Sequence, residues 1–306
     1  MHILITSIQG PAGQALLAQF AEARHSHHRV VGVDVDPVDH PVLHAAEQVP
    51  PASDPTRIDR LVEIVRRHDI DVVIPTVEEE LSHVARATEE CRFYPARVVI
   101  SEAENVDLAC DKYQTMLRLE QAWVPIPRFT CPSHHQGPSS VVEAVGEHAI
   151  IKPRTGGGSL GVRELHPALL REAEWLDIEE DSLIQEFAAG QEFASMVYLP
   201  PGDAPPTVVV VEATCGPDDK ASDAHRLPGD ICPEVRRIAL AAARTLRLRG
   251  PVDVDLRCLA DGRPVVLEVN ARFGADTAHA PEILDALLQD LTADLVPGLS
   301  ADWDCR

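Results

Sequence analysis

Three side chains near the C-terminus have the types and spacing of a set of oxygen ligands. Asp255 lies in a run of alternating apolar and polar residues, and Glu268 and Asn270 lie in a second such run. Asp261-Gly262 separates the two runs, and this dipeptide is a strong signal for a two-residue hairpin loop. The sequence therefore predicts a β-hairpin with oxygen ligands on one face.

The position of the turn predicts which residues face each other across the hairpin. Counting back from the turn pairs Asp255 with Glu268 and Asp253 with Asn270, and alternation puts all four on one face. Opposed carboxylates repel unless a cation lies between them, and Mg²⁺ prefers such oxygen ligands. The hairpin thus indicates a metal-carboxylate platform, although an ordinary solvated strand face could carry the same acids. The opposite face is expected to be core, formed by Val254, Leu256, Cys258, Val265, Leu267 and Val269.

Lysine is scarce in this chain, since only Lys112, Lys152 and Lys220 occur among 27 basic residues. A lysine retained among arginines can mark a compact point charge, although genomic composition would also produce the bias. Lys152 precedes a glycine-rich segment at residues 155–162. Glycines let backbone amides approach phosphate oxygens, and a nearby lysine neutralises phosphate charge. This combination predicts a phosphate-binding loop.

The spacing Gly156-x-Gly158-x-x-Gly161 also fits a dinucleotide-binding fingerprint. A Rossmann turn passes directly into a helix, whereas residues 162–165 are expected to form a strand and Pro167 follows them. The sequence has no P-loop motif, and it lacks the His-Arg-Asp and Asp-Phe-Gly motifs of protein kinases. The remaining interpretation is a phosphate-binding flap between two strands, paired with the carboxylate hairpin.

Short apolar strands alternate with amphipathic helices over residues 1–108, which predicts a parallel α/β layer. Ligand-facing loops in such layers follow the strand C-termini, here residues 7–13 and 75–78. A proline-rich breaker at residues 124–127 follows the last helix of this part. The expected strands span residues 3–6, 30–35, 71–75 and 98–100, and the expected helices span residues 12–23, 56–67, 79–90 and 111–121.

Length and charge restrict the classes of partner. A chain of 306 residues exceeds the usual size of one core, so we expect two or three domains. The net charge of −22 argues against nucleic acid or an anionic membrane surface as partner. Seven scattered cysteines and the absence of a signal sequence favour a soluble, cytoplasmic protein with reduced thiols. A homodimer is the default expectation for such a protein.

The order of these motifs resembles the ATP-grasp superfamily, in particular members similar to biotin carboxylase and the carbamoyl-phosphate synthase large subunit. The resemblance covers essentially the whole chain and implies an ATP-grasp fold of mixed α/β and α+β class. It implies a Rossmann-like N-terminal domain at residues 1–108, and a linker helix with a small flap domain at residues 109–187. A C-terminal α+β domain at residues 188–306 would then hold ATP against the flap.

The resemblance also assigns nucleotide contacts. Lys112, at the start of an expected helix, resembles the first ATP lysine of the family, and Lys152 resembles the second. The segment at residues 183–193 resembles the one whose Glu186 end and backbone face adenine and whose Glu192 reaches the ribose hydroxyls. The implied contacts are Lys112, Lys152, Gly156, Gly157, Gly158, Ser159, Gly161, Glu186, Phe187, Ala188 and Glu192.

Glu268-x-Asn270-x-Arg272 resembles the metal-binding motif of the family, with Asp255 as the partner ligand. The implied metal ligands are therefore Asp255, Glu268 and Asn270, and the implied cofactors are ATP and Mg²⁺, with Mn²⁺ as an alternative. Members of the group often have glutamine at the position of Asp255, so this carboxylate set is a departure. Arg272 and Lys152 are the implied catalytic residues, and Arg272 would hold a substrate carboxylate or acyl phosphate.

The activity that the resemblance implies is an ATP-dependent carboxylate-amine ligase. The carboxylate would form an acyl phosphate, and an amine would then displace phosphate to give an amide. Small, amino-acid-like carboxylates and amines are the expected partners. The alternatives are a phosphotransferase that stops at the acyl phosphate and an ATP-binding sensor without turnover.

Two acceptor-side assignments stay open in the sequence. His225 lies in the loop at residues 213–229, which we expect to border the acceptor site, and it is a candidate general base. Glu78, Glu79 and Glu80 could bind a substrate amino group, but the dipole of a helix N-terminus would also favour these acids.

Overall fold

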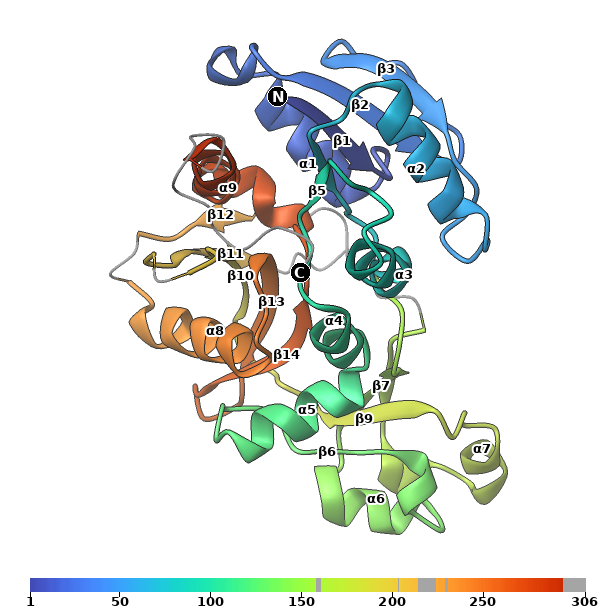
Figure 1. Ribbon diagram of the computed structural model, residues 1–306. Helices are drawn as coiled ribbons and strands as arrows, with labels where there is room; N and C mark the ends of the chain where they lie inside the picture. Colours follow the sequence, from blue (N-terminus) through green and yellow to red (C-terminus); the bar gives the residue numbers. More distant parts are fainter. Residues whose placement is uncertain (158–160, 203, 214–223, 229–230, 294–306) are drawn as a thin grey trace.

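The computed structural model describes residues 1–157, 161–202, 204–213, 224–228 and 231–293. Within these residues the strands form one sheet of parallel strands and two antiparallel sheets (Figure 1). No helix in the described part of the chain is long and apolar enough to cross a membrane. The combination agrees with the predicted mixture of α/β and α+β structure.

The N-terminal sheet is entirely parallel, as predicted. Its strand order is β3 (Leu43–Gln48), β2 (Arg29–Asp34), β1 (His2–Thr6), β4 (Val72–Ile74) and β5 (Arg97–Val98). The order reverses between β1 and β4, and the loops that follow these two strands therefore border a crevice. The sequence predicted both of these loops at the crevice.

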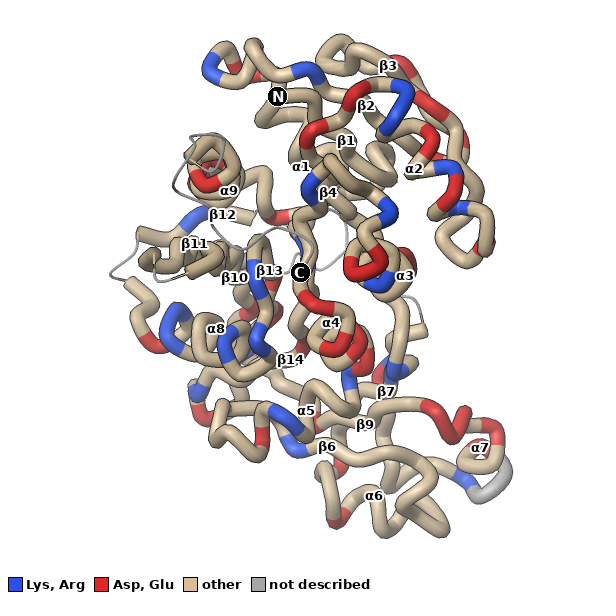
Figure 2. The backbone as a smooth tube through the Cα atoms, viewed as in Figure 1, with Lys and Arg blue, Asp and Glu red and all other residues tan. Residues whose placement is uncertain are grey.

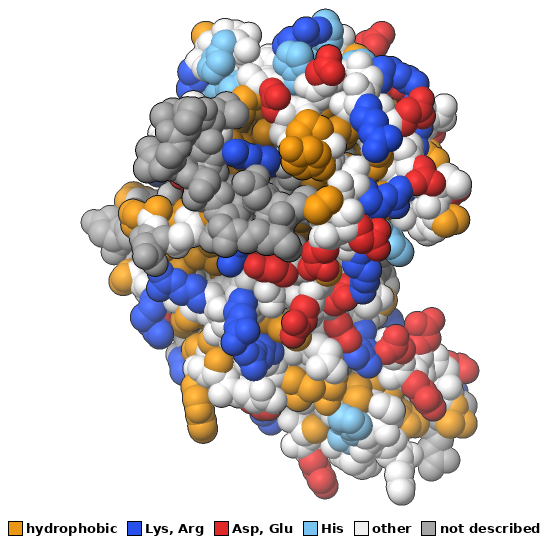
Figure 3. All heavy atoms as spheres, viewed as in Figure 1, with side chains coloured by type: hydrophobic (Ala, Val, Ile, Leu, Met, Phe, Trp, Pro, Cys, Tyr) orange, Lys and Arg blue, Asp and Glu red, His pale blue; other side chains and the backbone are white. Residues whose placement is uncertain are grey.

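Helices surround this sheet. They are α1 (Pro11–Phe20), α2 (Arg57–Arg67) and α3 (Glu78–Glu89), with the 3-10 turn η1 (Ala23–His25), and α4 (Ala103–Cys110) follows the last strand. The sequence did not predict β3 or α4. Strand β3 is an edge strand without fully buried residues, and α4 buries mainly the small side chains of Ala103, Val106 and Ala109. Figure 3 shows acidic side chains gathered over the middle of the visible face, near α3 and α4.

The middle sheet is antiparallel and carries the glycine-rich loop. Its strand order is β6 (Phe129–Thr130), β9 (Ser182–Glu186), β7 (Ala149–Pro153) and β8 (Arg163–Leu165). The pairing of β7 with β8 confirms the predicted strand, loop and strand. One face of the sheet packs on α6 (Pro138–Val145). The remaining elements here are α5 (Lys112–Gln121), η2 (Pro132–His134), η3 (Pro167–Leu169) and α7 (Glu172–Leu176).

The C-terminal sheet is also antiparallel. Its strand order is β12 (His225–Arg226), β11 (Thr207–Ala213), β10 (Glu192–Leu199), β13 (Gly250–Cys258) and β14 (Pro264–Asn270). Helix α8 (Pro233–Thr245) covers one face, and α9 (Pro281–Ala293) covers the other, next to η4 (Ala275–His279) (Figure 1). Apolar residues of α9 share one core with α1, which packs the N-terminal layer against this sheet. The domain boundaries at residues 108 and 187 stay a prediction.

The predicted pairing of the carboxylate hairpin is confirmed. Strands β13 and β14 pair Asp255 with Glu268 and Asp253 with Asn270. These four residues are the oxygen-bearing set that the alternation pattern placed together. The register is therefore as predicted at the positions that matter for the site.

The turn and the ladder differ from the prediction in two compensating ways. The N–H of Leu259 donates to the carbonyl oxygen of Arg263 at 2.9 Å, so the loop has three residues and ends at Gly262, whose φ is 85°. Leu267 is an extra residue in β14, a bulge that restores the predicted pairing beyond it. Because of the bulge, Val266 joins the core beneath the hairpin, and Leu267 is only half-buried. The predicted core position of Leu267 is therefore wrong, whereas Val265 is buried as predicted.

Candidate active site

A cavity of about 440 Å³ lies between the middle and C-terminal sheets. Leu267, displaced by the bulge, is one of its lining residues, and so are the paired carboxylates Asp255 and Glu268. Gly158 and Ser159 lie outside the described residues, and Gly161 packs beside Pro153. The other predicted nucleotide contacts all line the cavity, namely Lys112, Lys152, Gly156, Gly157, Glu186, Phe187, Ala188 and Glu192.

Lys112 enters the site from the N-terminus of α5. The Asp111 carboxylate caps this helix by accepting from two backbone N–H groups, which fixes where the next side chain begins. The Lys112 ammonium lies 3.3 Å from Glu268 Oε1 and 3.5 Å from Glu78 Oε1, and it donates to the carbonyl oxygen of Gly156. One buried cation therefore connects the N-terminal layer, the glycine-rich loop and the hairpin.

Lys152 enters the site from β7 of the middle sheet, whereas the hairpin belongs to the C-terminal sheet. Its Nζ lies 3.6 Å from Glu268 Oε2 and donates to the carbonyl oxygen of Leu267 at 3.0 Å. Burial lowers the pKa of Lys152, and the Glu268 carboxylate acts against this shift. Cationic and anionic segments accordingly lie together where α5 and β7 meet (Figure 2). The two lysines thus converge on one carboxylate in the cavity.

The hairpin carboxylates lack full compensation of their charge. Asp253 is buried, and its Oδ1 has no hydrogen-bond partner among the described residues. Burial raises the pKa of Asp253 to about 7, and burial together with the Asp253 carboxylate raises the pKa of Asp255. Asn270 Nδ2 donates to Asp255 Oδ2 at 3.4 Å. Crowded carboxylates with an orphaned oxygen are the donor set that a hard divalent cation fits.

Arg272 extends from the end of β14 over this set. Its Nη2 donates to Asn270 Oδ1 at 3.3 Å, and its Nη1 donates to the carbonyl oxygen of Phe273 at 2.8 Å. Nη1 also lies 3.9 Å from Asp253 Oδ2, while Nε has no hydrogen-bond partner within the described part. The guanidinium therefore retains one free donor for an anionic group.

Glu78 lies beside Lys112 in the candidate site. A favourable interaction with the dipole of α3 would not by itself explain this position. The residue follows β4 at the reversal of strand order, and its Oε2 is buried without a hydrogen-bond partner among the described residues. Burial raises the pKa of Glu78, whereas Lys112 and Arg272 act to lower it. The two neighbouring acids differ, since Glu79 is exposed and Glu80 pairs with Arg57 at 2.6 Å. A position after β4 at the switch point was the sequence signal for Glu78.

The adenine end of the predicted site shows one difference and one addition. The Glu186 carboxylate is held by Arg128, whose Nε lies 3.0 Å away, so this side chain is already engaged. Gln185, which sequence reasoning missed, lines the cavity, and its buried Nε2 has no partner in the described part. The candidate base His225 instead lies on β12, 3.1 Å from the carboxylate of Glu212, and is not among the cavity-lining residues.

Comparison with known proteins gives a family for most of the chain. The ATP-grasp domain family matches residues 109–276, and the PylC-like N-terminal domain family matches residues 3–98. D-alanine–D-alanine ligase B of Chromobacterium violaceum is 30% identical over 186 residues, which cover 56% of this chain and 60% of that protein. For D-alanine–D-alanine ligase of Aromatoleum aromaticum the identity is 28%, over 61% of this chain and 64% of that protein. The matched part is thus less than two thirds of these relatives.

Solved structures resemble the whole fold at lower identity. The L-amino acid ligase from Bacillus licheniformis superposes with a TM-score of 0.67 at 20% identity, covering 91% of this chain and 69% of that chain. The D-alanine–D-alanine ligase from Bacillus anthracis has a TM-score of 0.62 at 16% identity, with 95% of both chains covered. These likenesses establish the fold alone. Because the ATP-grasp domain family matches more than half of its residues, the chain belongs to the ATP-grasp family.

Proposed function

We propose that this protein is an ATP-dependent ligase that joins a carboxylate to an amine. The observation that carries the proposal is the convergence of Lys112 and Lys152 on Glu268 within the cavity. Two buried ammonium groups beside carboxylates suit a triphosphate and its counter-ion. Family membership supports the same assignment, since relatives of this chain are named D-alanine–D-alanine ligase.

The proposed reaction has two steps. A carboxylate oxygen of one substrate attacks the γ-phosphorus of ATP, and ADP leaves with the electron pair of the broken bond. The amine of the second substrate then attacks the carbonyl carbon of the acyl phosphate, and phosphate leaves as the amide forms and the amine loses a proton. Phosphoryl transfer of this kind depends mainly on positioning and charge neutralisation.

The residues of the site have distinct proposed roles. Lys112 and Lys152 would contact the phosphate chain of ATP, and Arg272 would bind the substrate carboxylate and then the acyl phosphate through its free Nε. The proposed ligands of Mg²⁺ are Asp255, Glu268 and Asn270. The buried Asp253 pairs with Asn270 across the hairpin and would add negative charge beside them. Bound Mg²⁺ supplies further neutralisation of phosphate charge. Removal of one such positioned charge typically lowers kcat by about 10²-fold to 10³-fold.

We assign Glu78 to the substrate amino group. Its unpaired Oε2 faces the glycine-rich loop, where a Cβ built on Gly157 would lie 3.0 Å from it. A buried carboxylate oxygen without a partner is costly unless a donor from the ligand satisfies it. An α-ammonium group offers three such donors. Amino acids are therefore the substrate class that we propose, and the names of the curated relatives agree with it.

The test is turnover of Mg·ATP with amino acids supplied singly and in pairs. Phosphate release, nucleotide products and the masses of new compounds are measured together. The ligase proposal predicts ADP, phosphate and an amide, and Glu268→Gln should abolish all three. Glu234→Gln is the matched control, because this glutamate is exposed on α8 and, among the described residues, its ion pair is with Arg237 at i,i+3. Formation of AMP and pyrophosphate would contradict the acyl-phosphate route, and ADP without an amide would favour a phosphotransferase.

A further inference from the structure

Three potential metal ligands lie at one edge of the middle sheet, away from the hairpin carboxylates. The β7–β8 ladder pairs Ala149 with Leu165, so His148 and His166 follow directly beyond this pair on opposite strands. Glu164 lies two residues before His166 and shares its face of the sheet. The antiparallel register alone therefore brings two imidazoles and one carboxylate together.

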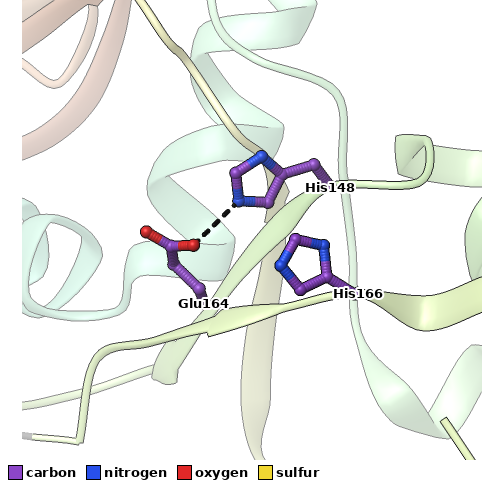
Figure 4. Close-up of side chains that lie close together, drawn as sticks. All are labelled: His148, Glu164 and His166. Atoms are coloured by element: carbon purple, nitrogen blue, oxygen red, sulfur yellow. Dashed lines mark hydrogen bonds and ion pairs between the residues drawn. The ribbon is translucent and has the colours of Figure 1, made fainter. Parts of the chain in front are cut away.

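The side chains of His148, Glu164 and His166 lie close together (Figure 4). His148 Nε2 lies 3.1 Å from Glu164 Oε2, and the rings of His148 and His166 stack with centroids 4.6 Å apart. One ligand atom from each of the three residues can be chosen so that all lie within 4.8 Å of one another. The ligand atoms of a tetrahedral zinc ion, with bonds of about 2.0–2.1 Å, are about 3.3 Å apart. One of the three separations, 3.1 Å between His148 and Glu164, is close to this length. The other two require the exposed His166 ring to rotate away from its stack on His148, because an imidazole nitrogen binds a metal in the plane of its ring.

The neighbouring strand holds one of the rings in place. Phe187 stacks on His148 with ring centroids 3.9 Å apart and an interplanar angle of 19°. The N–H of Phe187 also donates to the carbonyl oxygen of His148 at 3.1 Å. One ligand is thus pre-oriented by packing, which reduces the entropy lost when an ion binds. Glu164 and His166 are exposed, so an ion can reach the cluster and keep water as a further ligand.

We propose that His148, Glu164 and His166 form a binding site for a divalent transition-metal ion of the zinc class. Two imidazoles and one carboxylate are a ligand set that suits Zn²⁺ or Co²⁺, whereas Mg²⁺ prefers oxygen ligands alone. The site is therefore chemically distinct from the hairpin carboxylates. Glu164 also lines the nucleotide cavity, so the ion lies at the rim of that cavity. This proposal does not depend on the ligase activity.

The test is a titration of the full-length, chelator-treated protein with Co²⁺, followed by visible absorption, and then displacement by Zn²⁺. The wild-type protein should bind one Co²⁺ per chain at this site, with ligand-field bands in the visible region that Zn²⁺ removes. His166→Ala and Glu164→Gln should each weaken Co²⁺ binding at least about tenfold, as expected for the loss of a ligand.

His27→Ala is the matched control, because His27 is also exposed and lies beside another histidine, His28. It should leave the titration unchanged. Circular dichroism of each variant checks that the fold is retained, and Glu164→Gln preserves the shape of the side chain if His166→Ala disturbs it. Equal Co²⁺ affinity in the wild type and both ligand variants would overturn the proposal, as would a loss confined to His27→Ala.

Discussion

Lys152 and Glu268 form an ion pair between two different sheets, with 3.6 Å between Nζ and Oε2. The lysine belongs to the strand before the glycine-rich loop, and the glutamate belongs to the carboxylate hairpin. Both side chains line the same cavity, and Lys112 reaches the other oxygen of the same carboxylate. A nucleotide bound in this cavity would therefore meet charges from both sheets at once.

Replacement of Lys152 by methionine should remove the positive charge while keeping most of the side-chain volume. We expect kcat/KM for ATP to fall by about 10²-fold to 10³-fold, because the proposed contact between this buried cation and phosphate is lost. Steady-state kinetics and calorimetric titration with ADP measure the effect. Arg171→Met is the control, since Arg171 is exposed and, within the described part of the chain, its ion pair is with Glu174 three residues away. Unchanged nucleotide binding in Lys152→Met would remove this residue from the proposed site.

Glu78→Gln should separate recognition of the amino acid from binding of the nucleotide. If the Glu78 carboxylate binds a substrate ammonium, KM for the amino acid should rise about tenfold or more, since a charged hydrogen bond is lost. The dissociation constant for ADP should change far less. The neighbouring Glu79→Gln is the matched control, because Glu79 is exposed at the same helix N-terminus. A similar rise in both variants would exclude the specific role of Glu78.

Gly274 is required by the buried Asp253. A Cβ at Gly274 would lie 2.1 Å from Asp253 Oδ2 and 2.4 Å from its Cγ, so one of the two residues must move. We expect Gly274→Ala to lower the free energy of unfolding by about 1–3 kcal/mol, as overpacking typically does. Urea denaturation measures the change. Gly137→Ala is the control, since a Cβ there meets no atom within 4 Å, and only the loss of a glycine N-cap, at most about 1 kcal/mol, is expected. Equal changes in the two variants would argue against the close approach.

Local signals in the sequence were sufficient for the hairpin and the flap. Alternation and one turn dipeptide placed Asp255 opposite Glu268, and that pairing is confirmed. The three-residue loop and the bulge at Leu267 could not be predicted, because their effects on the register cancel. The core position predicted for Leu267 was therefore wrong, even though Val265 is buried as predicted and the register at the carboxylates was right.

Contacts between segments that are distant in the sequence could not be predicted from local patterns. Glu78 is the first residue of α3, and its carboxylate contacts Lys112 because the start of α3 lies near the start of α5 in the fold. No local sequence pattern encodes that contact. The cluster around His148 and His166 likewise requires the register of β7 and β8, which the intervening loop does not specify. Strand β3 was not predicted, because its residues are at most half-buried and its sequence shows no clear alternation of apolar and polar residues.

The free energy of unfolding should fall in mild acid, because the protonation of His28 is opposed by its burial in the folded N-terminal layer. Burial lowers the pKa of His28 to about 4, from an ordinary value near 6.5. Between these values the unfolded chain binds a proton that the folded chain does not. The contribution of His28 to stability is therefore full above pH 6.5 and declines as the pH falls toward 4.

The free energy of unfolding, measured at about pH 7.5 and about pH 5, should fall more steeply for the wild type than for His28→Gln. The comparison of slopes matters, because other groups titrate in both proteins. Parallel losses of stability in the two proteins would show that His28 does not titrate as its burial implies.

The most direct test of the ligase account follows one oxygen atom. An amino acid that supports turnover is labelled with ¹⁸O in its carboxyl group, and the released phosphate is analysed by mass spectrometry. Attack of the carboxylate on the γ-phosphorus requires one ¹⁸O atom to leave with phosphate, while the other stays in the amide. We expect this transfer in the wild-type protein and none in Glu268→Gln. Phosphate free of label, formed together with an amide, would contradict the acyl-phosphate intermediate.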